Sequence, residues 1–570
     1  MADGTASTSP PSQLPDPDSP FARVLARVLA HRWRTSPVAA TADGCYERAD
    51  ELDSFDARTL AAQLDETDGL VADLRALDGD ALSPDEALDR DAVLGTLTAD
   101  LHDWRVLRTW TWNPAICADT ALYGCHLLAI RDTRPVAERM GWLAGRLHQV
   151  PRTLAEGLAA IREPSAILTE TAIESCDGAR ELFRTTLPAA AEAAPPLLRD
   201  AVARGCAAAS AAFEAHAREL AAILARGEAT RSPAIGEEAF TDRFEQAHGL
   251  AISTDALLRL SAEVRASTEE RLAAVAARID PTRTWREVVA GLRSDHPAPE
   301  DLLAAYRGDV ERMRTAIAAR RLATATDDPL AVIETPLFER PLYPVAAYLQ
   351  PAPLDRGGGG YFYVTPVDER ADPSDRAAAL AQHGRATIAL LTVHEAYPGH
   401  HLQMTRAKRS GSIARLIYGT PLLWEGWALY CEQMMVEEVL GDDLRVELTQ
   451  LRDALFRAWR IDIDVRLHRG EWTPQECERR LVRELDMAPA TARAEVRRYA
   501  AWPTQASTYL VGRELLLDLR QRLREREGSA FDLGRFHDRV LGFGNLSPAR
   551  IREVLLGEPA AGAATETGRG

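Results

Sequence analysis

The feature that most constrains the fold is a helical periodicity that runs through most of the 570 residues. Apolar side chains recur every three to four positions in long Ala-, Leu-, Arg- and Glu-rich segments, such as "LLRLSAEVRASTEERLAAVAARI" and "LLAAYRGDVERMRTAIAARRLA". This spacing places the apolar side chains on one face of an α-helix, whereas a half-buried strand needs strict alternation. Together with the chain length, the pattern predicts a mostly α protein with more than one lobe.

One segment departs from this pattern and suggests how the chain is divided. Residues 326–375 are rich in proline, contain four consecutive glycines and include short aromatic stretches, of which "YFYVTP" is the best predicted strand. We therefore expect a small β element near residues 330–370. The predicted organisation is a disordered tail at 1–20, an N-terminal helical half at 21–325, the strand-containing segment at 326–375, a C-terminal helical catalytic half at 376–557 and a disordered tail at 558–570.

Charge and cysteine usage exclude several classes of function. A net charge of −18 argues against non-specific binding to nucleic acid or to anionic membrane surfaces, because both need a basic face. The seven cysteines are scattered without a C-x-x-C motif, which disfavours a disulfide framework and fits a reducing cytoplasm. We find no signal-peptide pattern and no apolar run of about 18 residues, so a cytoplasmic protein is expected. Nothing in the sequence specifies an oligomeric state.

The stretch "TVHEAYPGHHLQ", residues 392–403, has the composition of a metal site. A hydrolytic zinc site takes three protein ligands, often two His and one Glu, and leaves a position for water. The common helical form is H-E-x-x-H, in which two histidines four residues apart share one helix face. His394 and Glu395 match its start, but Pro398 stands where the second histidine would be. A hydrogen-bonded polar helix end is the alternative explanation.

Pro398 predicts a break in the helix, and this break would bring a second histidine close to His394. In a continuous helix its ring would clash with the carbonyl of His394, and Tyr397 before it is pushed out of helical geometry. We therefore expect a break near Tyr397 and a new turn that begins at Pro398. The break would return one of the two following histidines to His394; the spacing favours His400 and leaves His401 as the alternative.

A third ligand is expected from "LLWEGWALYCEQMM", residues 422–435. Glu425 is flanked by Trp424 and Trp427, an apolar setting in which an unpaired carboxylate would be costly and a metal ion would offset that cost. Glu432 lies two turns later on nearly the same face. It is better explained as a supporting or solvent-facing residue than as a ligand.

These motifs resemble the bacterial DUF885 family. "HEAYPGHHLQ" followed by "WEGWALYCEQ" carries the resemblance, and "TWTWNPA", "RLHQVPRTLAEGLAAI" and "PTQASTYLVGRELL" extend it to about residues 20–555. The family is similar to gluzincin-type zinc metallopeptidases, particularly the M32 and M3 groups. The resemblance therefore implies a mostly α, multi-helix, gluzincin-like metallopeptidase scaffold.

The resemblance also implies roles for individual residues. His394, one of His400 or His401, and Glu425 would bind one Zn²⁺ or another divalent metal, and Glu395 would be the general base. Four more candidates are His468 and Tyr509 for hydrogen bonds to the oxyanion, and Arg460 and Arg513 for a substrate carboxylate. A helix C-terminal cap at His468, a core tyrosine and ordinary ion pairs are the alternatives for these four. Tyr361 follows the glycine run, where a strand edge could add an extended substrate by main-chain hydrogen bonds.

The function expected from these residues is zinc-dependent hydrolysis of a peptide or small amide substrate. A metal-dependent enzyme that acts on an amino-acid-like small molecule in secondary metabolism is an alternative. A catalytically inactive helical binding protein is another, although the presence of both Glu395 and Glu425 counts against it.

Overall fold

The computed structural model describes residues 18–336, 339–340, 343, 345–355 and 357–557. It is mostly helical with a small three-stranded sheet, which confirms the predicted fold class. Both predicted disordered tails fall mainly on residues 1–17 and 558–570, outside the described residues. No helix in the described part of the chain is long and apolar enough to cross a membrane.

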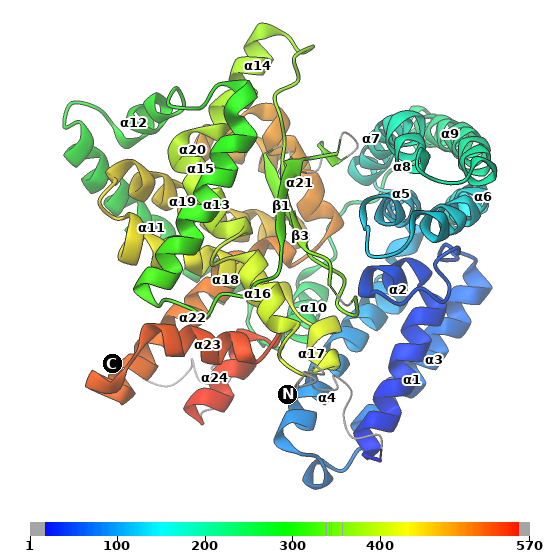
Figure 1. The fold of residues 1–570 in the computed structure, drawn as a ribbon, viewed down its shortest axis with the longest axis horizontal. Coiled ribbons are helices and arrows are strands. Elements are labelled where there is room, and N and C mark those ends of the chain that lie inside the picture. Colours follow the sequence, from blue (N-terminus) through cyan, green and yellow to red (C-terminus); the bar gives the residue numbers. More distant parts are fainter. Residues whose placement is uncertain (1–17, 337–338, 341–342, 344, 356, 558–570) are drawn as a thin grey trace, which may run out of the picture.

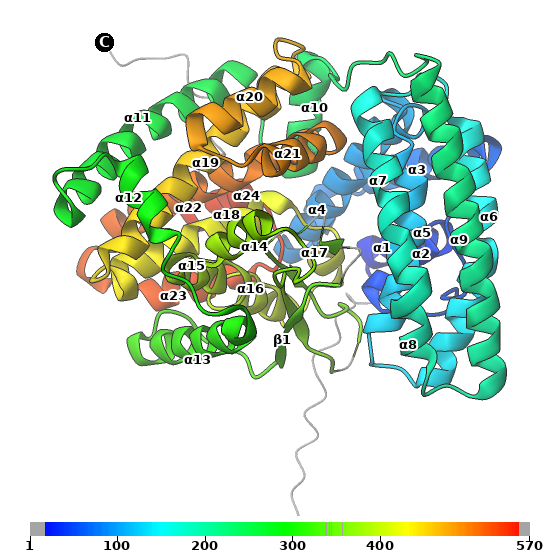
Figure 2. The ribbon, with the colours of Figure 1, turned by 90° about the horizontal axis from the view of Figure 1, so that it is seen from above.

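The first nine helices form one lobe, most of which lies at the right of Figures 1 and 2, while α4 lies nearer the middle of both views. Four of them, α5, α6, α7 and α9, pack into a bundle whose core contains Leu147, Phe183 and Phe213. Shorter helices extend this bundle, and α1, α3 and α4 lie beside it. The bounds are α1 (Pro20–Thr35), α2 (Pro37–Asp43), α3 (Ala57–Arg75), α4 (Pro84–Leu101), α5 (Ala115–Ile130), α6 (Val136–Ala160), α7 (Ala166–Glu181), α8 (Leu187–Ala191) and α9 (Pro196–Ala225).

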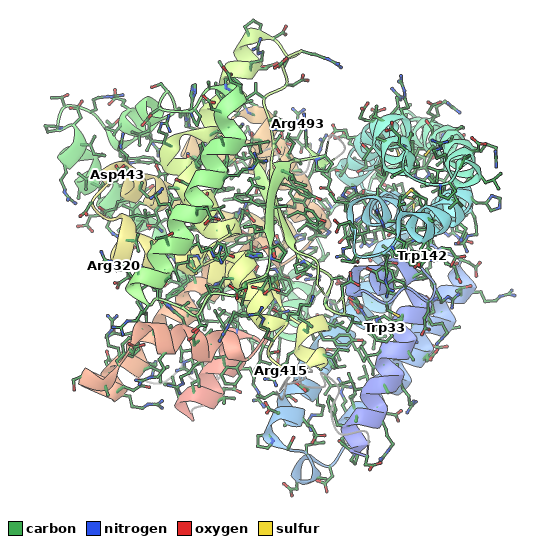
Figure 3. The ribbon with its side chains drawn as sticks, in the orientation of Figure 1. Trp33, Trp142, Arg320, Arg415, Asp443 and Arg493 are labelled. Atoms are coloured by element: carbon green, nitrogen blue, oxygen red, sulfur yellow. The ribbon has the colours of Figure 1, made fainter. Side chains whose placement is uncertain are left out.

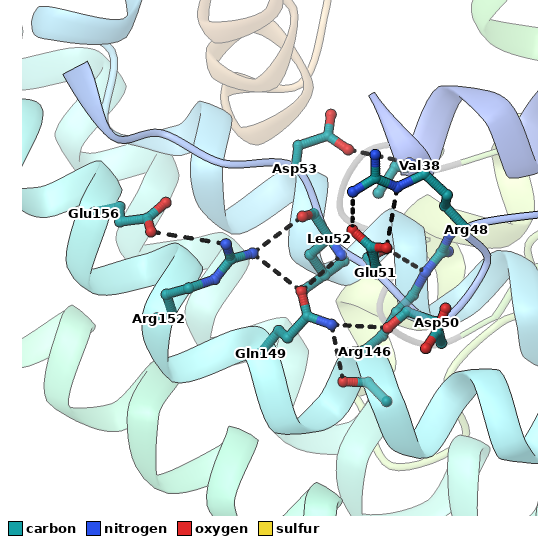
Figure 4. Close-up of polar contacts among 11 residues, drawn as sticks. Val38, Arg48, Asp50, Glu51, Leu52, Asp53, Arg146, Gln149, Arg152 and Glu156 are labelled. Atoms are coloured by element: carbon teal, nitrogen blue, oxygen red, sulfur yellow. Dashed lines mark hydrogen bonds and ion pairs between the residues drawn. The ribbon is translucent and has the colours of Figure 1, made fainter. Parts of the chain in front are cut away.

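Backbone groups of the loop between α2 and α3 are satisfied by side chains of α6 (Figure 4). Gln149 accepts from the amide of Leu52 at 3.2 Å and donates to the carbonyl of Asp50 at 2.9 Å. Arg152 donates to the carbonyl of Leu52 at 3.0 Å. A loop without secondary structure needs such partners for its buried peptide groups, so these contacts fix the loop against the bundle.

The second lobe contains the remaining helices and the sheet. Its large core joins Val332 and Phe362 of the sheet to Val393, Leu423 and Leu516 of the helices. The helix bounds are α10 (Glu237–His248), α11 (Thr254–Ile279), α12 (Trp285–Leu292), α13 (Leu302–Arg320), α14 (Pro373–Leu380), α15 (Arg385–Glu395), α16 (His400–Ala407), α17 (Ile413–Ile417), α18 (Pro421–Met435), α19 (Leu444–His468), α20 (Pro474–Leu485), α21 (Pro489–Ala501), α22 (Gln505–Glu527), α23 (Leu533–Gly542) and α24 (Pro548–Leu556).

The sheet has the order β1–β3–β2 and contains the best predicted strand at its centre. Its strands are β1 (Leu330–Glu334), β2 (Ala346–Leu349) and β3 (Gly360–Val364). β3 pairs in parallel with β1, Leu330 opposite Gly360, and antiparallel with β2, Leu349 opposite Tyr361. The hydrogen-bonding edges of β3 are therefore both occupied. The expectation that this strand offers a free edge for an extended substrate is wrong.

The lobes meet at the lower side of the view in Figure 1, where α4 contacts α10 and α17. Arg415 of α17, labelled in Figure 3, is 5% exposed and its side chain lies 2.7 Å from Asp89 and 3.0 Å from Asp85, both on α4. A second link involves Asp355, which accepts hydrogen bonds from Tyr46 at 2.8 Å and Thr133 at 2.6 Å. These polar contacts join segments more than 200 residues apart.

In the structure the second lobe begins near residue 237, earlier in the chain than the boundary at residue 326 that the sequence pattern predicts. α11 packs along α19, and α13 packs on α15 and β1, so residues 237–320 belong spatially to the second lobe. Helical periodicity is the same on both sides of this boundary, and the partner of an apolar helix face is not encoded in its spacing. The change in composition at residue 326 marks the sheet and not a lobe boundary.

Two glycines allow α18 and α22 of the second lobe to cross at close range. A Cβ atom on Gly426 would lie 2.5 Å from the Cα of Gly512, a separation that real Cβ atoms do not tolerate. The absence of a side chain at both positions lets the helix backbones touch. Because Glu425 precedes Gly426 and Tyr509 lies one turn before Gly512, this crossing also places two candidate site residues.

We predict that Gly512→Ala destabilises the protein, because the methyl group would force α18 and α22 apart. The expected cost is about 1–3 kcal/mol, typical of overpacking in a core, seen as a lower midpoint in thermal unfolding. Gly69→Ala in α3 is the matched control: nothing lies within 4 Å of its added Cβ, and alanine has the higher helix propensity. Equal midpoints for the two variants would show that the crossing is not close-packed.

Candidate metal centre

The helical path is interrupted between α15 and α16, over residues 396–399. The amide of Tyr397 donates to the carbonyl of Thr392, five residues back, and that of Gly399 donates to the carbonyl of Val393, six residues back, at 2.9 Å. These wide turns replace the i→i−4 ladder of an α-helix. The new helix begins at His400 with Gly399 as its N-cap, so the prediction that it starts at Pro398 is wrong by two residues.

Gly399 and Trp427 hold this break in place. A Cβ on Gly399 would collide with the carbonyl oxygens of His394 and Val393, so only glycine fits there. The indole Nε1–H of Trp427 donates to the carbonyl of Pro398 at 2.8 Å. Trp427 is fully buried on α18, and the helix that supplies Glu425 therefore also fixes the turn that carries the histidines.

The break brings three predicted ligands together. Glu425 Oε2 lies 3.8 Å from His394 Nε2 and 3.5 Å from His400 Nε2, and the three donor atoms all lie within 4.8 Å of one another. Around a tetrahedral zinc with bonds of about 2.0–2.1 Å, ligand atoms are about 3.3 Å apart. An ordinary N–H···O hydrogen bond is shorter, about 2.9 Å. The spacing of this His394–His400–Glu425 group thus fits a shared cation.

Glu432 supports the first histidine from behind. Its Oε1 lies 2.8 Å from His394 Nδ1, and it is 2% exposed. A carboxylate can only accept, so Nδ1 carries the hydrogen and Nε2 faces the other two ligands. Carboxylate–histidine pairs of this kind orient metal-binding imidazoles. The seven-residue spacing on α18 thus places Glu425 and Glu432 on opposite edges of one imidazole ring.

The charges of the group are strongly coupled. Burial by itself would lower the pKa of His394. The contacts with Glu425 and Glu432 outweigh burial and raise this pKa to about 10. In the same way, burial would raise the pKa of Glu425, but His394 and His400 hold that pKa well below its usual range. Two carboxylates around one imidazole create a strongly cation-favouring environment. A metal ion at Nε2 would displace the proton and satisfy that preference.

Glu395 is positioned as the expected base. It is the last residue of α15, 8% exposed, and burial raises its pKa. It directly follows His394 in the chain, and after burial the charges of His394 and His400, which lower the pKa, are the next largest influences on its carboxyl group. A raised pKa brings a carboxylate closer to the value at which it can both accept and return a proton near neutral pH.

His401 points away from the ligand group. Its Nε2 lies 3.1 Å from the carbonyl of Asp328 and therefore carries the hydrogen, so Nδ1 accepts from the hydroxyl of Tyr348 at 3.1 Å. Burial lowers its pKa to about 4, which keeps the ring neutral. His401 is therefore not a ligand in this structure, and His400 is the second histidine of the group.

Tyr509 lies near the helix that carries Glu425, because it packs in one apolar cluster with Leu422 and Leu429 of α18. The guanidinium of Arg460 stacks on the Tyr509 ring, 4.5 Å from its centroid. Gln505 donates to the Tyr509 hydroxyl at 3.3 Å. Burial, and next the charge of Glu425, raise the pKa of Tyr509, so its phenol stays protonated.

The remaining predicted residues are engaged elsewhere. His468 is fully buried; its Nε2 lies 3.0 Å from the carbonyl of Tyr499 and burial lowers its pKa to about 4. A neutral core histidine therefore replaces both the catalytic role and the charged helix cap expected there. Arg513 bonds to Glu514 at 2.9 Å. Tyr361 faces the first lobe and donates to the carbonyl of Ile130 at 3.4 Å.

Sequence reasoning missed two neighbours of the site. Tyr348 of β2 stacks on the His400 ring, with centroids 6.3 Å apart and an angle of 20°, and Arg457 of α19 lies 3.8 Å from Glu432. Neither residue belongs to a motif. Both come from segments more than 20 residues away from the ligands, and only the packing of the elements brings them near.

Comparison with known proteins identifies the family. A family model described as "Bacterial protein of unknown function (DUF885)" matches residues 37–555. The chain belongs to the DUF885 family.

Two solved structures share the fold. One, from Shewanella oneidensis, is described as a "putative lipoprotein of unknown function"; it is 23% identical with a TM-score of 0.78 and the match covers 94% of this chain and 99% of that one. The other, a "putative lipoprotein" from Colwellia psychrerythraea, is 19% identical with a TM-score of 0.80, over 95% and 99% of the two chains. No curated protein matches the chain. The fold of this DUF885 chain is thus shared, and its site must be interpreted from its own residues.

The two adjacent histidines allow a direct test of the ligand assignment. We predict that His400→Ala abolishes stoichiometric zinc binding, whereas His401→Ala keeps about one zinc per chain. The first removes a donor atom and the second removes a hydrogen bond to β2. Metal content of both proteins, measured by mass spectrometry after dialysis, decides the matter; equal loss in both would contradict the assignment.

Glu432 offers a second test. We predict that Glu432→Gln lowers zinc affinity about 10- to 100-fold, because supporting carboxylates contribute that much to metal binding. Competition with a chromophoric chelator measures the affinity. Glu438→Gln, just beyond the end of α18, is the matched control and should bind zinc like the unmodified protein. An unchanged affinity in Glu432→Gln would exclude the supporting role.

Proposed function

We propose that the protein is a zinc-dependent hydrolase of peptide or small amide bonds. The observation that supports this most is the convergence of His394 Nε2, His400 Nε2 and Glu425 Oε2, with a buried carboxylate, Glu395, next to His394 in the chain. Two imidazoles and one carboxylate are the ligand set of many hydrolytic zinc sites. We also propose, from the resemblance of the sequence motifs, that the protein is related to gluzincin metallopeptidases.

Each group around the centre has a part in the proposed reaction. His394, His400 and Glu425 would hold the zinc ion, which when bound supplies a Lewis acid that polarises the carbonyl and acidifies water. Glu395 accepts a proton from the attacking water and returns it to the leaving amine. No side chain in the described part of the chain accepts the Tyr509 hydroxyl hydrogen, and Tyr509 donates it to the developing oxyanion.

The cytoplasm remains the proposed location. All seven cysteines are free thiols and six are buried, which fits a reducing compartment. The two similar solved structures are each described as a "putative lipoprotein", and fractionation of the native host would decide between the cytoplasm and a membrane-anchored location.

Glu395→Gln tests the reaction. We predict that this variant binds zinc normally but loses about 10²- to 10⁴-fold in kcat, because an amide cannot accept the proton. A survey of peptides and N-acyl amino acids by mass spectrometry would first identify a substrate for the wild type. Glu447→Gln, which changes a carboxylate near Arg278, should retain full activity.

Two outcomes would contradict the proposal. Turnover by Glu395→Gln at the wild-type rate would exclude this residue as the base. Activity that survives complete removal of zinc by a chelator would exclude the metal-dependent reaction.

A further inference from the structure

Tyr348 of β2 points toward the helices that carry the ligand group. It lies directly opposite Phe362 of β3 in the antiparallel register, and residues opposite one another share a face of the sheet. Phe362 belongs to the core of the second lobe, together with Val393 of α15. Tyr361 and Tyr363 alternate with Phe362 and therefore lie on the other face, where Tyr361 contacts the first lobe. The register thus directs the Tyr348 ring to the side on which α15 packs.

Both adjacent histidines of α16 contact this tyrosine. Its ring stacks on that of His400, with centroids 6.3 Å apart and an angle of 20°. It meets the ring of His401 edge-on, at 5.7 Å and 73°, and its hydroxyl donates to His401 Nδ1 at 3.1 Å. His401 is held in turn, because its Nε2 donates to the carbonyl of Asp328 at 3.1 Å. The hydroxyl of Tyr348 is therefore anchored, while its ring lies nearly parallel to that of His400.

The glycine at the start of β3 leaves the space that this ring occupies. A Cβ atom on Gly360 would collide with the hydroxyl oxygen and ring carbons of Tyr348, and one on Gly359 would collide with the carbonyl of Pro329. A larger residue at position 360 would therefore displace the ring from its place against the histidines. The glycine run, whose expected role was a strand edge for the substrate, instead allows the backbone to approach Tyr348 closely.

The His400 ring lacks the hydrogen bond that orients His394. The Nδ1 of His394 is bonded to Glu432 at 2.8 Å, and such bonds normally fix the plane of a metal-binding imidazole. The Nδ1 of His400 is buried and has no hydrogen-bond partner among the described residues, while its Nε2 lies 3.5 Å from Glu425. Ring contacts remain to set its plane: the His394 ring lies perpendicular to it at 4.8 Å, and the Tyr348 ring lies nearly parallel.

We propose that Tyr348 is a positioning residue that holds the His400 ring in the plane in which Nε2 faces the metal. Stacking restricts rotation of the imidazole, and the hydrogen bond to His401 keeps the phenol ring in its place. His401 is not a ligand, but it thereby takes part in orienting one. This inference rests on the zinc centre of the proposed hydrolase and specifies how one of its ligands is oriented.

Zinc affinity of variants at residue 348, measured by competition with a chromophoric chelator, tests this role. We expect Tyr348→Leu, which removes both the ring and the hydroxyl, to bind zinc about 10- to 100-fold more weakly, as the loss of an orienting group does. Tyr348→Phe keeps the stacked ring and should lose only about 2- to 10-fold, the range for one hydrogen bond. His401→Ala removes the other partner of that hydrogen bond and should match Tyr348→Phe, a loss compatible with one zinc per chain.

A second readout separates orientation from stability. With Co²⁺ in place of zinc, the visible absorption bands report the ligand geometry; they should shift in Tyr348→Leu and be nearly restored in Tyr348→Phe. Tyr363→Leu is the matched control, since this buried tyrosine lies on the other face of the sheet. It should lower the midpoint of thermal unfolding as Tyr348→Leu does, yet leave the zinc affinity and the cobalt spectrum unchanged.

Each outcome has a definite meaning. Wild-type affinity and an unchanged cobalt spectrum in Tyr348→Leu would overturn the proposal and leave the proposed hydrolase unaffected. Equal losses of affinity in Tyr348→Leu and Tyr363→Leu would also overturn it, because they would indicate a general loosening of the sheet. Weaker zinc binding in Tyr348→Leu alone, without hydrolysis by the wild type, would support the orienting role and refute the hydrolase. A wild type that binds no zinc would overturn both.

Discussion

The hydrogen bond from Trp427 to the carbonyl of Pro398 joins the two parts of the candidate metal centre. Without the break at residues 396–399, His400 would be rotated roughly 120° around the helix from His394 and could not share an ion with it. The broken ladder leaves a carbonyl that needs a donor in a buried place, and the indole of α18 supplies it. Because the same helix carries Glu425 and Glu432, this contact ties the turn that precedes His400 to the helix that supplies both carboxylates.

Burial then gives this geometry its chemical character. Glu425 and Glu432 flank His394 in a medium of low polarity, where charges interact strongly, and their attraction to a proton on His394 outweighs the effect of burial on its pKa. Tyr348 and His401 form a second layer against the sheet, while Arg460 and Tyr509 form the opposite boundary. The carboxylates of Glu425 and Glu432 thus make the group around His394 negatively charged, an arrangement that suits a cation.

Several features could be predicted from the sequence for definite physical reasons. Apolar spacing identifies helices because it depends only on local geometry, and Pro398 marks a break because its ring cannot fit inside a helix. Predictions failed where the outcome depends on distant partners. His468 is of a residue type common in catalytic sites, but its ring packs on Phe240 in the core. The strand after the glycine run, β3, has both of its edges occupied, by β1 and β2. The lobe boundary was missed for the same reason, since helix faces do not specify which helix they meet.

The sequence by itself determined the helical class, the DUF885 family and the set of residues able to bind a metal, because composition and spacing along one chain carry that information. Tertiary structure decided between His400 and His401: consecutive residues on a helix point about 100° apart, and only the position of Glu425 shows which ring faces the ligands. It also placed Glu432 on the far side of His394 and brought Tyr348 of β2 and Arg457 of α19 close to the group. These are relations between elements, set by packing and not by order along the chain.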